Sequence, residues 1–204
     1  MSLFLLIRHG NTDMVGRVLA GRMPGVHLND EGRSQVRELV DCLATFPISC
    51  ICSSPLERAL ETAGPIAESK DLTIEIRHGL NEVDVGEWTG LDFVRLEPVE
   101  MWRRFNLFRT GTRIPGGEHI FEVQARMVAE VESLRKQFPD GTIALVSHAD
   151  PIKTIIAHYA GIKLDSWDRI SVDTGSVSLL KVEERRSCLH CLNHRGKLLP
   201  ENPA

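Results

Sequence analysis

The sequence of 204 residues lacks a long hydrophobic run, an excess of positive charge, and any internal repeat or low-complexity segment. Its longest N-terminal apolar stretch, Leu3 to Ile7, is far shorter than the roughly 20 residues of a transmembrane helix, and no basic segment precedes it as in a signal peptide. The formal net charge of -4 gives no electrostatic basis for binding nucleic acid or an anionic membrane. We therefore expect a cytoplasmic protein that binds neither.

The chain has an odd number of cysteines, five in all. Because a chain of this length can bury a core without crosslinks, reduced thiols in the cytosol are the simplest interpretation. The segment "CLHCLNH" contains the residue types that bind zinc. On a strand, however, Cys188 and His190 would face one side and Cys191 the other, so one ion could not reach them all. We therefore predict no metal site and no cofactor.

The remaining composition is that of an ordinary globular protein, and we expect one domain over residues 1–204. Apolar runs predict strands at 3–7, 48–52, 72–76, 142–147, 177–182 and 188–192. Helical periodicity predicts helices at 31–45, 55–68, 91–109, 121–138 and 151–160. This alternation predicts a three-layer α/β/α sandwich with a mostly parallel central sheet. Residues 88–120 are expected to form a helical and loop insertion that covers the site.

Helix boundaries follow from a few local signals. Ser53 or Ser54 is expected to cap the helix that starts at Pro55, because a hydroxyl before proline is a common helix start. Pro65 should kink or end this helix. Asp150 is expected to cap the helix over 151–160.

Polar residues follow three of the predicted strands. Arg8 and His9 come directly after the first strand, Arg58 follows the second, and His148 follows the strand over 142–147. Because ligands bind beyond the carboxyl ends of parallel strands, we expect these side chains to share one crevice. The planar fork of arginine matches phosphate oxygens, so the crevice suits a multiply charged anion.

Histidine in such a crevice can act on phosphorus. A neutral imidazole nitrogen can attack a phosphoryl group and form a phosphohistidine. The leaving alcohol then needs a proton, and Glu82 in the loop "LNEVDVGEW" is the best candidate donor, with Asp84 and Glu87 as alternatives in the same loop. A phosphate dianion would raise the pKa of that carboxyl group. The arginines and histidines supply the positive charge, so no metal is required.

Five motifs in order, "LIRHGNTD", "SSPLERALETA", "LNEVDVGEWTG", "PGGE" and "VSHAD", resemble the histidine phosphatase superfamily, the phosphoglycerate mutase-like group with an Arg-His-Gly motif. The resemblance extends from residue 3 to about 180 and implies the phosphoglycerate mutase-like fold. It implies that His9 is the phosphorylated nucleophile and that Arg8, Arg58 and His148 complete the phosphate pocket. Glu82 would be the general acid and then the base that activates water.

The resemblance also implies weaker assignments and shows some departures. Asn11 and Thr12 would hydrogen-bond the phosphoryl group or the loop. Arg17 and Arg22 lie where members of the family often contact substrate. Many members have Gly-Gly after the second histidine, where this chain has Ala149 and Asp150, and an acid there would alter substrate choice. His119 replaces a frequent serine, so it faces either the site or the surface, and Arg103 and Arg104 form either a second anion site or a solvated helix face.

These observations predict an enzyme of the histidine acid-type phosphatase class, a metal-independent hydrolase acting on a small phosphorylated metabolite. The first alternative is a phosphoglycerate mutase-type phosphomutase, but the stretch between Glu82 and His148 is short for a mutase of this family. The second alternative is a non-catalytic phosphate-binding or scaffold protein. Pairing of the edge strand near the C-terminus would give a homodimer, which the sequence leaves open.

Overall fold

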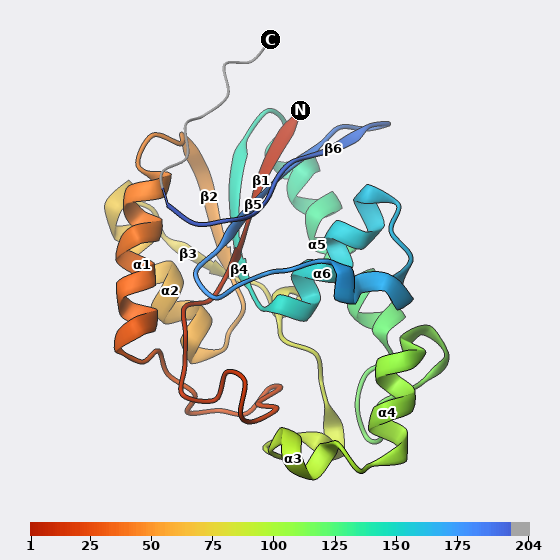
Figure 1. Ribbon diagram of the computed structural model, residues 1–204. Helices are drawn as coiled ribbons and strands as arrows, with labels where there is room; N and C mark the ends of the chain where they lie inside the picture. The colour runs from red at the N-terminus through yellow and green to blue at the C-terminus, as the bar shows by residue number, and fades with distance from the viewer. Residues whose placement is uncertain (197–204) are drawn as a thin grey trace.

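A computed structural model describes residues 1–196, and a six-stranded sheet of order β3-β2-β4-β1-β5-β6 forms its centre (Figure 1). The pairs β1–β4, β2–β4 and β2–β3 are parallel, whereas β5 is antiparallel to both β1 and β6. The predicted mostly parallel sheet is therefore confirmed. The strands are β1 (Ser2–Arg8), β2 (Ile48–Ser53), β3 (Ile74–Ile76), β4 (Thr142–Ser147), β5 (Val177–Val182) and β6 (Ser187–His194).

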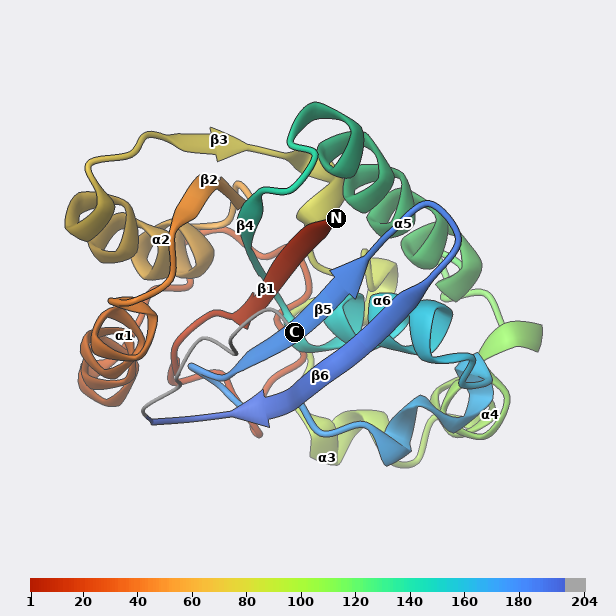
Figure 2. The ribbon, with the colours of Figure 1, turned by 90° about the horizontal axis from the view of Figure 1, so that it is seen from above.

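Helices cover both faces of the sheet and confirm the three layers (Figure 2). One face packs on α1 (Asp30–Leu43) and α2 (Glu57–Lys70), and the other on α5 (Ile120–Gln137) and α6 (Ala149–Ala160). Strand β1 shows the alternation: Leu5 and Ile7 join the core beneath α1 and α2, whereas Phe4 and Leu6 join the opposite core. All four side chains are at most 1% exposed, as expected for a central strand that is apolar on both faces.

Helix α2 begins later and runs further than its sequence predicts. It starts at Glu57 with Leu56 at the N-cap position, so Ser53 and Ser54 do not cap it, and Pro55 lies outside it. The Ser54 hydroxyl is instead used by the neighbouring loop and by His148. Pro65 does not end the helix, which continues to Lys70. Burial of the residues around Pro65 against the sheet outweighs the lost backbone hydrogen bond, which costs about 3 kcal/mol.

The prediction of a single helix over 91–109 is wrong. The chain forms α3 (Phe93–Leu96) and α4 (Glu100–Leu107), with Pro98 between them. Proline lacks the N–H group that would continue the first helix, which explains the break. Short 3₁₀ turns complete the description at His78–Leu80, Gly86–Trp88, Arg109–Gly111 and Leu164–Arg169.

Helix α6 starts two residues earlier than predicted. His148 occupies the N-cap position of α6. Asp150 lies in the first turn, where its negative charge interacts favourably with the helix dipole, but its side chain does not cap the helix. The expected cap by Asp150 is therefore wrong. Within the part of the chain that the structure describes, no helix combines the length and hydrophobicity needed to cross a membrane.

Candidate active site

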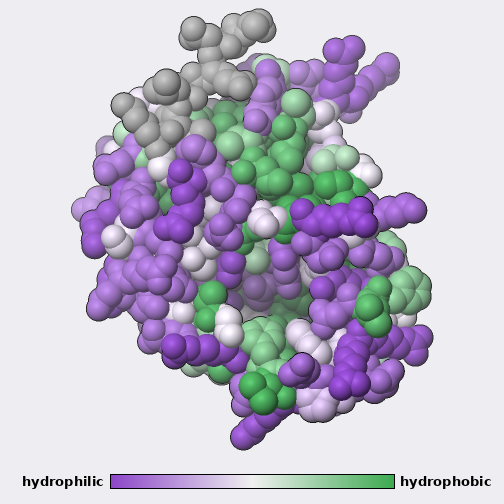
Figure 3. Space-filling view, in the orientation of Figure 1, coloured by the Kyte–Doolittle hydropathy of each residue, from purple (hydrophilic) through white to green (hydrophobic). Residues whose placement is uncertain are grey.

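A cavity of about 200 Å³ lies at the carboxyl ends of β1, β2 and β4. Arg8, His9, Arg58 and Glu82 line it, so side chains that follow separate strands share one cavity, whereas His148 is not among its lining residues. The long loop after β1 supplies much of the wall, and Phe93 joins it from α3. Figure 3 shows a mainly hydrophilic surface on the side seen in Figure 1. The other lining residues are Thr12, Met14, Val15, Gly16, Val18, Leu19, Ala20, Gly21, Val83, Val85, Ala149 and Asp150.

Glycine at two positions allows the loop after β1 to lie against the start of α1. A Cβ atom on Gly10 would come within 2.7 Å of the Gly32 carbonyl oxygen, and one on Gly32 within 2.2 Å of the Asn11 carbonyl oxygen. The Gly10 N–H also donates to Thr62 Oγ1 of α2 at 3.0 Å. These backbone contacts fix the position of His9 at the end of the strand.

His9 is held as a neutral imidazole with one free nitrogen. His9 is only 4% exposed, and its Nδ1 lies 2.7 Å from the Gly10 carbonyl oxygen. A carbonyl oxygen can only accept, so Nδ1 carries the proton and Nε2 keeps its lone pair. Burial, followed by the charges of Arg58 and Arg8, lowers the pKa of His9 well below its ordinary value. Nε2 is therefore available as a nucleophile.

His148 lies beside His9, with ring centroids 5.1 Å apart. Its Nε2 is 2.9 Å from Ser54 Oγ, and the Ser54 hydroxyl donates to Asn81 Oδ1 at 3.4 Å. His148 Nε2 therefore carries a proton that it donates to Ser54, and Nδ1 is left without a hydrogen bond, 3.9 Å from Glu82 Oε2. Burial, the neighbouring His9 and the nearby arginines lower the pKa of His148 well below its ordinary value.

Both arginines of the site hold buried nitrogen atoms without partners. Arg8 donates from Nη1 to the Val172 carbonyl oxygen at 2.7 Å, but its Nε has no acceptor. Arg58 donates from Nη2 to the Gly21 carbonyl oxygen at 2.8 Å, but its Nη1 has no acceptor. Unsatisfied buried donors are rare and destabilising. Two of them beside one cavity indicate an anion-binding site.

Glu82 provides a carboxyl group that retains its proton near neutral pH. Burial is the main cause and the charge of Asp150 the second, and together they raise the pKa of Glu82 to about 7 against the opposing effects of Arg58 and Arg8. The Val83 N–H donates to Glu82 Oε1 at 2.8 Å and fixes the carboxyl group. A carboxyl group with this pKa can donate a proton and later accept one.

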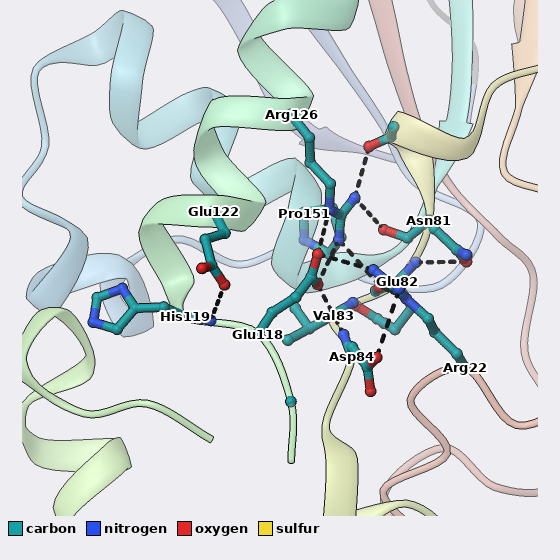
Figure 4. Close-up of polar contacts among 12 residues, drawn as sticks. Arg22, Asn81, Glu82, Val83, Asp84, Glu118, His119, Glu122, Arg126 and Pro151 are labelled. Carbon is teal, nitrogen blue, oxygen red and sulfur yellow. Dashed lines mark hydrogen bonds and ion pairs between the residues drawn. The ribbon is translucent and has the colours of Figure 1, made fainter. Parts of the chain in front are cut away.

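The loop that contains Glu82 is held by a cluster that sequence reasoning missed (Figure 4). Arg126 of α5 donates to the carbonyl oxygens of Gly79, Asn81 and Glu82 at 2.6–3.1 Å, and to both oxygens of Glu118 at 3.0 and 3.1 Å. Glu118 lies in the "PGGE" motif, but no periodicity or spacing singles out Arg126.

Arg22 belongs to this cluster and does not line the cavity. Its Nε donates to the Glu82 carbonyl oxygen at 2.8 Å, and its Nη2 lies 2.9 Å from Glu118 Oε1. Its guanidinium is therefore engaged by the protein rather than directed at a ligand. Arg17 is exposed and also lies outside the cavity lining. The structure thus places neither of the two arginines expected to bind substrate in the cavity.

The remaining candidates divide between cavity and scaffold. Thr12 lines the cavity, whereas the Asn11 side chain donates to Glu31 and accepts from the Thr12 N–H. Asp84 accepts from the Gly86 N–H at 3.0 Å and lies outside the lining, so Glu82 is the inward carboxylate of its loop. His119 is half-buried and caps α5.

Arg103 and Arg104 are exposed on α4 and are not among the cavity-lining residues. Their position fits a solvated helix face.

Comparisons with known proteins find relatives of this chain both in sequence and in structure. The model of the histidine phosphatase superfamily (branch 1) matches residues 4–195. Phosphoserine phosphatase 1 of Hydrogenobacter thermophilus is 30% identical, with 97% of this chain and 96% of the relative covered. A phosphoserine phosphatase from Entamoeba histolytica, solved with phosphoserine, is 26% identical with a TM-score of 0.85, covering 95% and 97%. The alpha-ribazole phosphatase from Shigella flexneri is 25% identical with a TM-score of 0.87, covering 98% and 100%.

Proposed function

Because the chain belongs to the histidine phosphatase superfamily (branch 1), we propose that it is a phosphatase that hydrolyses a small phosphomonoester through a phosphohistidine on His9. One observation supports this most strongly: the free Nε2 of His9 shares a cavity with the partnerless nitrogen atoms of Arg8 and Arg58. A nucleophile and two unsatisfied donors in one place match the needs of phosphoryl transfer.

In the first step, phosphoryl oxygens accept hydrogen bonds from Arg8 Nε and Arg58 Nη1. His9 Nε2 attacks phosphorus, and the bond from phosphorus to the alcohol oxygen breaks. Glu82 transfers its proton to that oxygen, so the alcohol leaves neutral. The Gly10 carbonyl oxygen holds the Nδ1 proton and orients the ring throughout. When the phosphoryl dianion binds, His148 Nδ1 takes up a proton from solvent and donates it in a hydrogen bond to a phosphoryl oxygen.

In the second step, the Glu82 carboxylate removes a proton from a water molecule. The water oxygen attacks phosphorus, the bond between phosphorus and Nε2 breaks, and His9 returns to its neutral form. Glu82 is protonated again and inorganic phosphate leaves. The positive charge around the phosphoryl oxygens comes from Arg8, Arg58 and His148, so neither step calls for a metal ion.

The lining of the cavity favours hydrolysis over the mutase alternative. A mutase must retain a second phosphate or carboxylate after the first transfer, which requires a further cation. Among the lining residues the only lysines or arginines are Arg8 and Arg58, which the first phosphoryl group occupies. Arg103 and Arg104 lie outside. The non-catalytic alternative has no specific observation in its favour, because Arg8, His9, Arg58 and Glu82 all line one cavity.

The same lining points to a substrate class. The wall beyond the phosphoryl position is largely apolar, through Met14, Val18, Leu19, Val85 and Phe93. Asp150 is the one charged group there besides those of the phosphoryl centre. A compact alcohol that is uncharged or bears an amino group fits this wall, whereas a second anionic group would meet Asp150 without a cation to balance it.

The test is phosphate release across a panel of phosphoethanolamine, phosphoserine, glycerol phosphate and 3-phosphoglycerate, assayed with and without EDTA. We expect metal-independent release that is fastest for glycerol phosphate and phosphoethanolamine, slower for phosphoserine because of its carboxylate, and slowest for 3-phosphoglycerate. Isomerisation of 3-phosphoglycerate with negligible phosphate release would establish a mutase instead. Loss of all activity with EDTA would refute the metal-free mechanism.

A further inference from the structure

Two thiols and a carboxylate meet at the edge of the sheet, away from the catalytic cavity. Cys50 and Cys52 occupy alternate positions of β2 and therefore share one face, and Glu75 of β3 pairs with Cys52 in the strand register. The two Sγ atoms are 3.6 Å apart, and Glu75 Oε1 is 3.5 Å from Cys50 Sγ. All three ligand atoms lie within 4.8 Å of one another. The proposed reaction uses none of these residues.

These separations match the coordination of zinc. Zinc binds thiolate sulfur at about 2.3 Å and carboxylate oxygen at about 2.0 Å in tetrahedral geometry. Two tetrahedral sulfur ligands are then about 3.8 Å apart, and a sulfur and an oxygen ligand about 3.5 Å apart. The observed separations of 3.6 and 3.5 Å need little adjustment to receive the ion.

An outer hydrogen bond orients the carboxylate. Arg77 donates to Glu75 Oε2 at 2.7 Å, which leaves Oε1 directed toward the thiols. Arg77 also donates to Gln137 of α5 at 3.3 Å and lies 3.7 Å from Glu130. Such partners around a ligand are typical of zinc sites and offset part of the negative charge of two thiolates and a carboxylate.

The site has a closed side and an open side. Cys52 is fully buried and Cys50 is 5% exposed, whereas the Glu75 side chain is 39% exposed. Strand β3 is the edge strand of the sheet (Figure 2), so no further strand covers Glu75. An ion can enter from this side, and a water molecule can complete the four ligands. Thiolate ligands with one carboxylate favour zinc over magnesium or calcium.

We propose that Cys50, Cys52 and Glu75 bind a zinc ion that stabilises the edge of the sheet formed by β2 and β3. The ion takes no part in phosphoryl transfer, because none of its three ligands lines the catalytic cavity. Its structural effect reaches the site only through β2, which leads directly into Ser54. The proposal is independent of the phosphatase mechanism.

The test uses cobalt(II) as a spectroscopic probe and zinc as the competing ion, on the reduced full-length protein. We expect one cobalt per chain, with the near-ultraviolet band of thiolate ligation and the visible bands of tetrahedral cobalt, displaced by one equivalent of zinc. Zinc should raise the melting temperature of the wild type. Removal of zinc should leave kcat unchanged.

Variants separate this site from adventitious thiol binding. Cys50→Ser and Cys52→Ser should abolish the thiolate band, whereas Cys188→Ser, which removes an exposed thiol on β6, should bind cobalt as the wild type does. Arg77→Gln should weaken zinc binding by about 10- to 100-fold. Circular dichroism and the metal-free melting temperature identify any variant that has not folded. If the cysteine variants do not fold, the zinc affinity of Arg77→Gln, which keeps both thiols, tests the site instead.

Three outcomes would overturn the proposal. The first is a folded, reduced wild type that binds no cobalt or zinc with thiolate ligation. The second is equal loss of the band in Cys188→Ser and Cys50→Ser. The third is a Cys50–Cys52 disulfide in protein purified and kept in reducing buffer, which would show that the thiols pair with each other.

Discussion

Arg58 and Arg126 come from helices on opposite faces of the sheet, and they differ in how their donors are used. Arg126 bonds from Nε, Nη1 and Nη2 to protein acceptors, and these bonds shape the loop that contains Glu82. Arg58 makes one bond to the Gly21 carbonyl oxygen and holds a buried Nη1 without a partner. An arginine whose donors all bond to the protein therefore holds the site in shape, whereas an arginine with an unpaired donor is available to bind the ligand.

The largest effect should come from Arg58→Gln. Loss of a guanidinium that contacts the transferring phosphoryl group should lower kcat/KM by about 10³-fold, or about 4 kcal/mol of transition-state stabilisation. The free energy of unfolding should change by only about 1 kcal/mol, because the protein itself uses a single bond. Steady-state kinetics and denaturant unfolding of the same sample measure both. A kcat/KM within threefold of the wild type would place Arg58 with the scaffold.

Arg126→Gln should show the reverse pattern. Removing Arg126 leaves Glu118 without its main partner and the carbonyl oxygens of Gly79 and Asn81 without a donor, which should lower the free energy of unfolding by about 3 kcal/mol. Denaturant unfolding measures this change. Activity of the folded fraction should fall less than in Arg58→Gln, because the Arg126 side chain is outside the cavity lining. Unchanged stability with a larger loss of activity would contradict the assignment.

Glu82→Gln should lower kcat by about 10²-fold for substrates with a poor leaving group. Its pH profile is the sharper measurement. Glu82 must be protonated in the first step and its pKa is about 7, so kcat/KM of the wild type should fall as pH rises through about 7. His9 must be neutral to attack, and its pKa is lowered. The loss of kcat/KM at acidic pH, the lower limb of the profile, should therefore lie well below pH 6.5.

The substrate's own ionisation affects the wild type and Glu82→Gln equally, so it cancels in the ratio of their kcat/KM values at each pH. The limb near pH 7 should be missing from Glu82→Gln. If this limb persists unchanged in the variant, another group is the acid.

Asp150→Asn should have the smallest effect. The charge of Asp150 raises the pKa of Glu82, so its removal should shift the upper limb of the pH profile to lower pH. Relative kcat/KM should also move from amino alcohols toward substrates with a second anionic group. The isosteric Asn keeps the size of the side chain and so isolates its charge. An unshifted limb and an unchanged preference would show that Asp150 does not act on the site.

The sequence predicts the convergence of Arg8, His9, Arg58 and His148 because strand ends meet by topology. It also predicts the inward acid, because the motif that holds Glu82 resembles its family. Both rest on local patterns that the sheet turns into geometry.

The predictions that were wrong concern residues whose roles depend on contacts with residues far away in the sequence. Packing against the sheet keeps α2 helical through Pro65. The Ser54 hydroxyl bonds to His148 instead of capping a helix. Arg22 resembles a substrate ligand by position but is neutralised by Glu118, which is distant in sequence. Arg126 has no sequence signal, since its function depends on the path of a loop that packs against α5 only in the folded chain. The pattern of apolar residues predicts where strands end, but it does not predict which charged side chains will pair in the folded chain.

Phosphorylation of His9 during turnover distinguishes this mechanism from direct hydrolysis, and a rapid-quench experiment detects it. Enzyme mixed with excess substrate is stopped with alkali within milliseconds, digested, and analysed by mass spectrometry, with His9→Ala as the control. We expect phosphate on His9 in the wild type, its accumulation in Glu82→Gln because water attack becomes slow, and none in His9→Ala. Phosphate on another residue, or full turnover by His9→Ala, would contradict this mechanism.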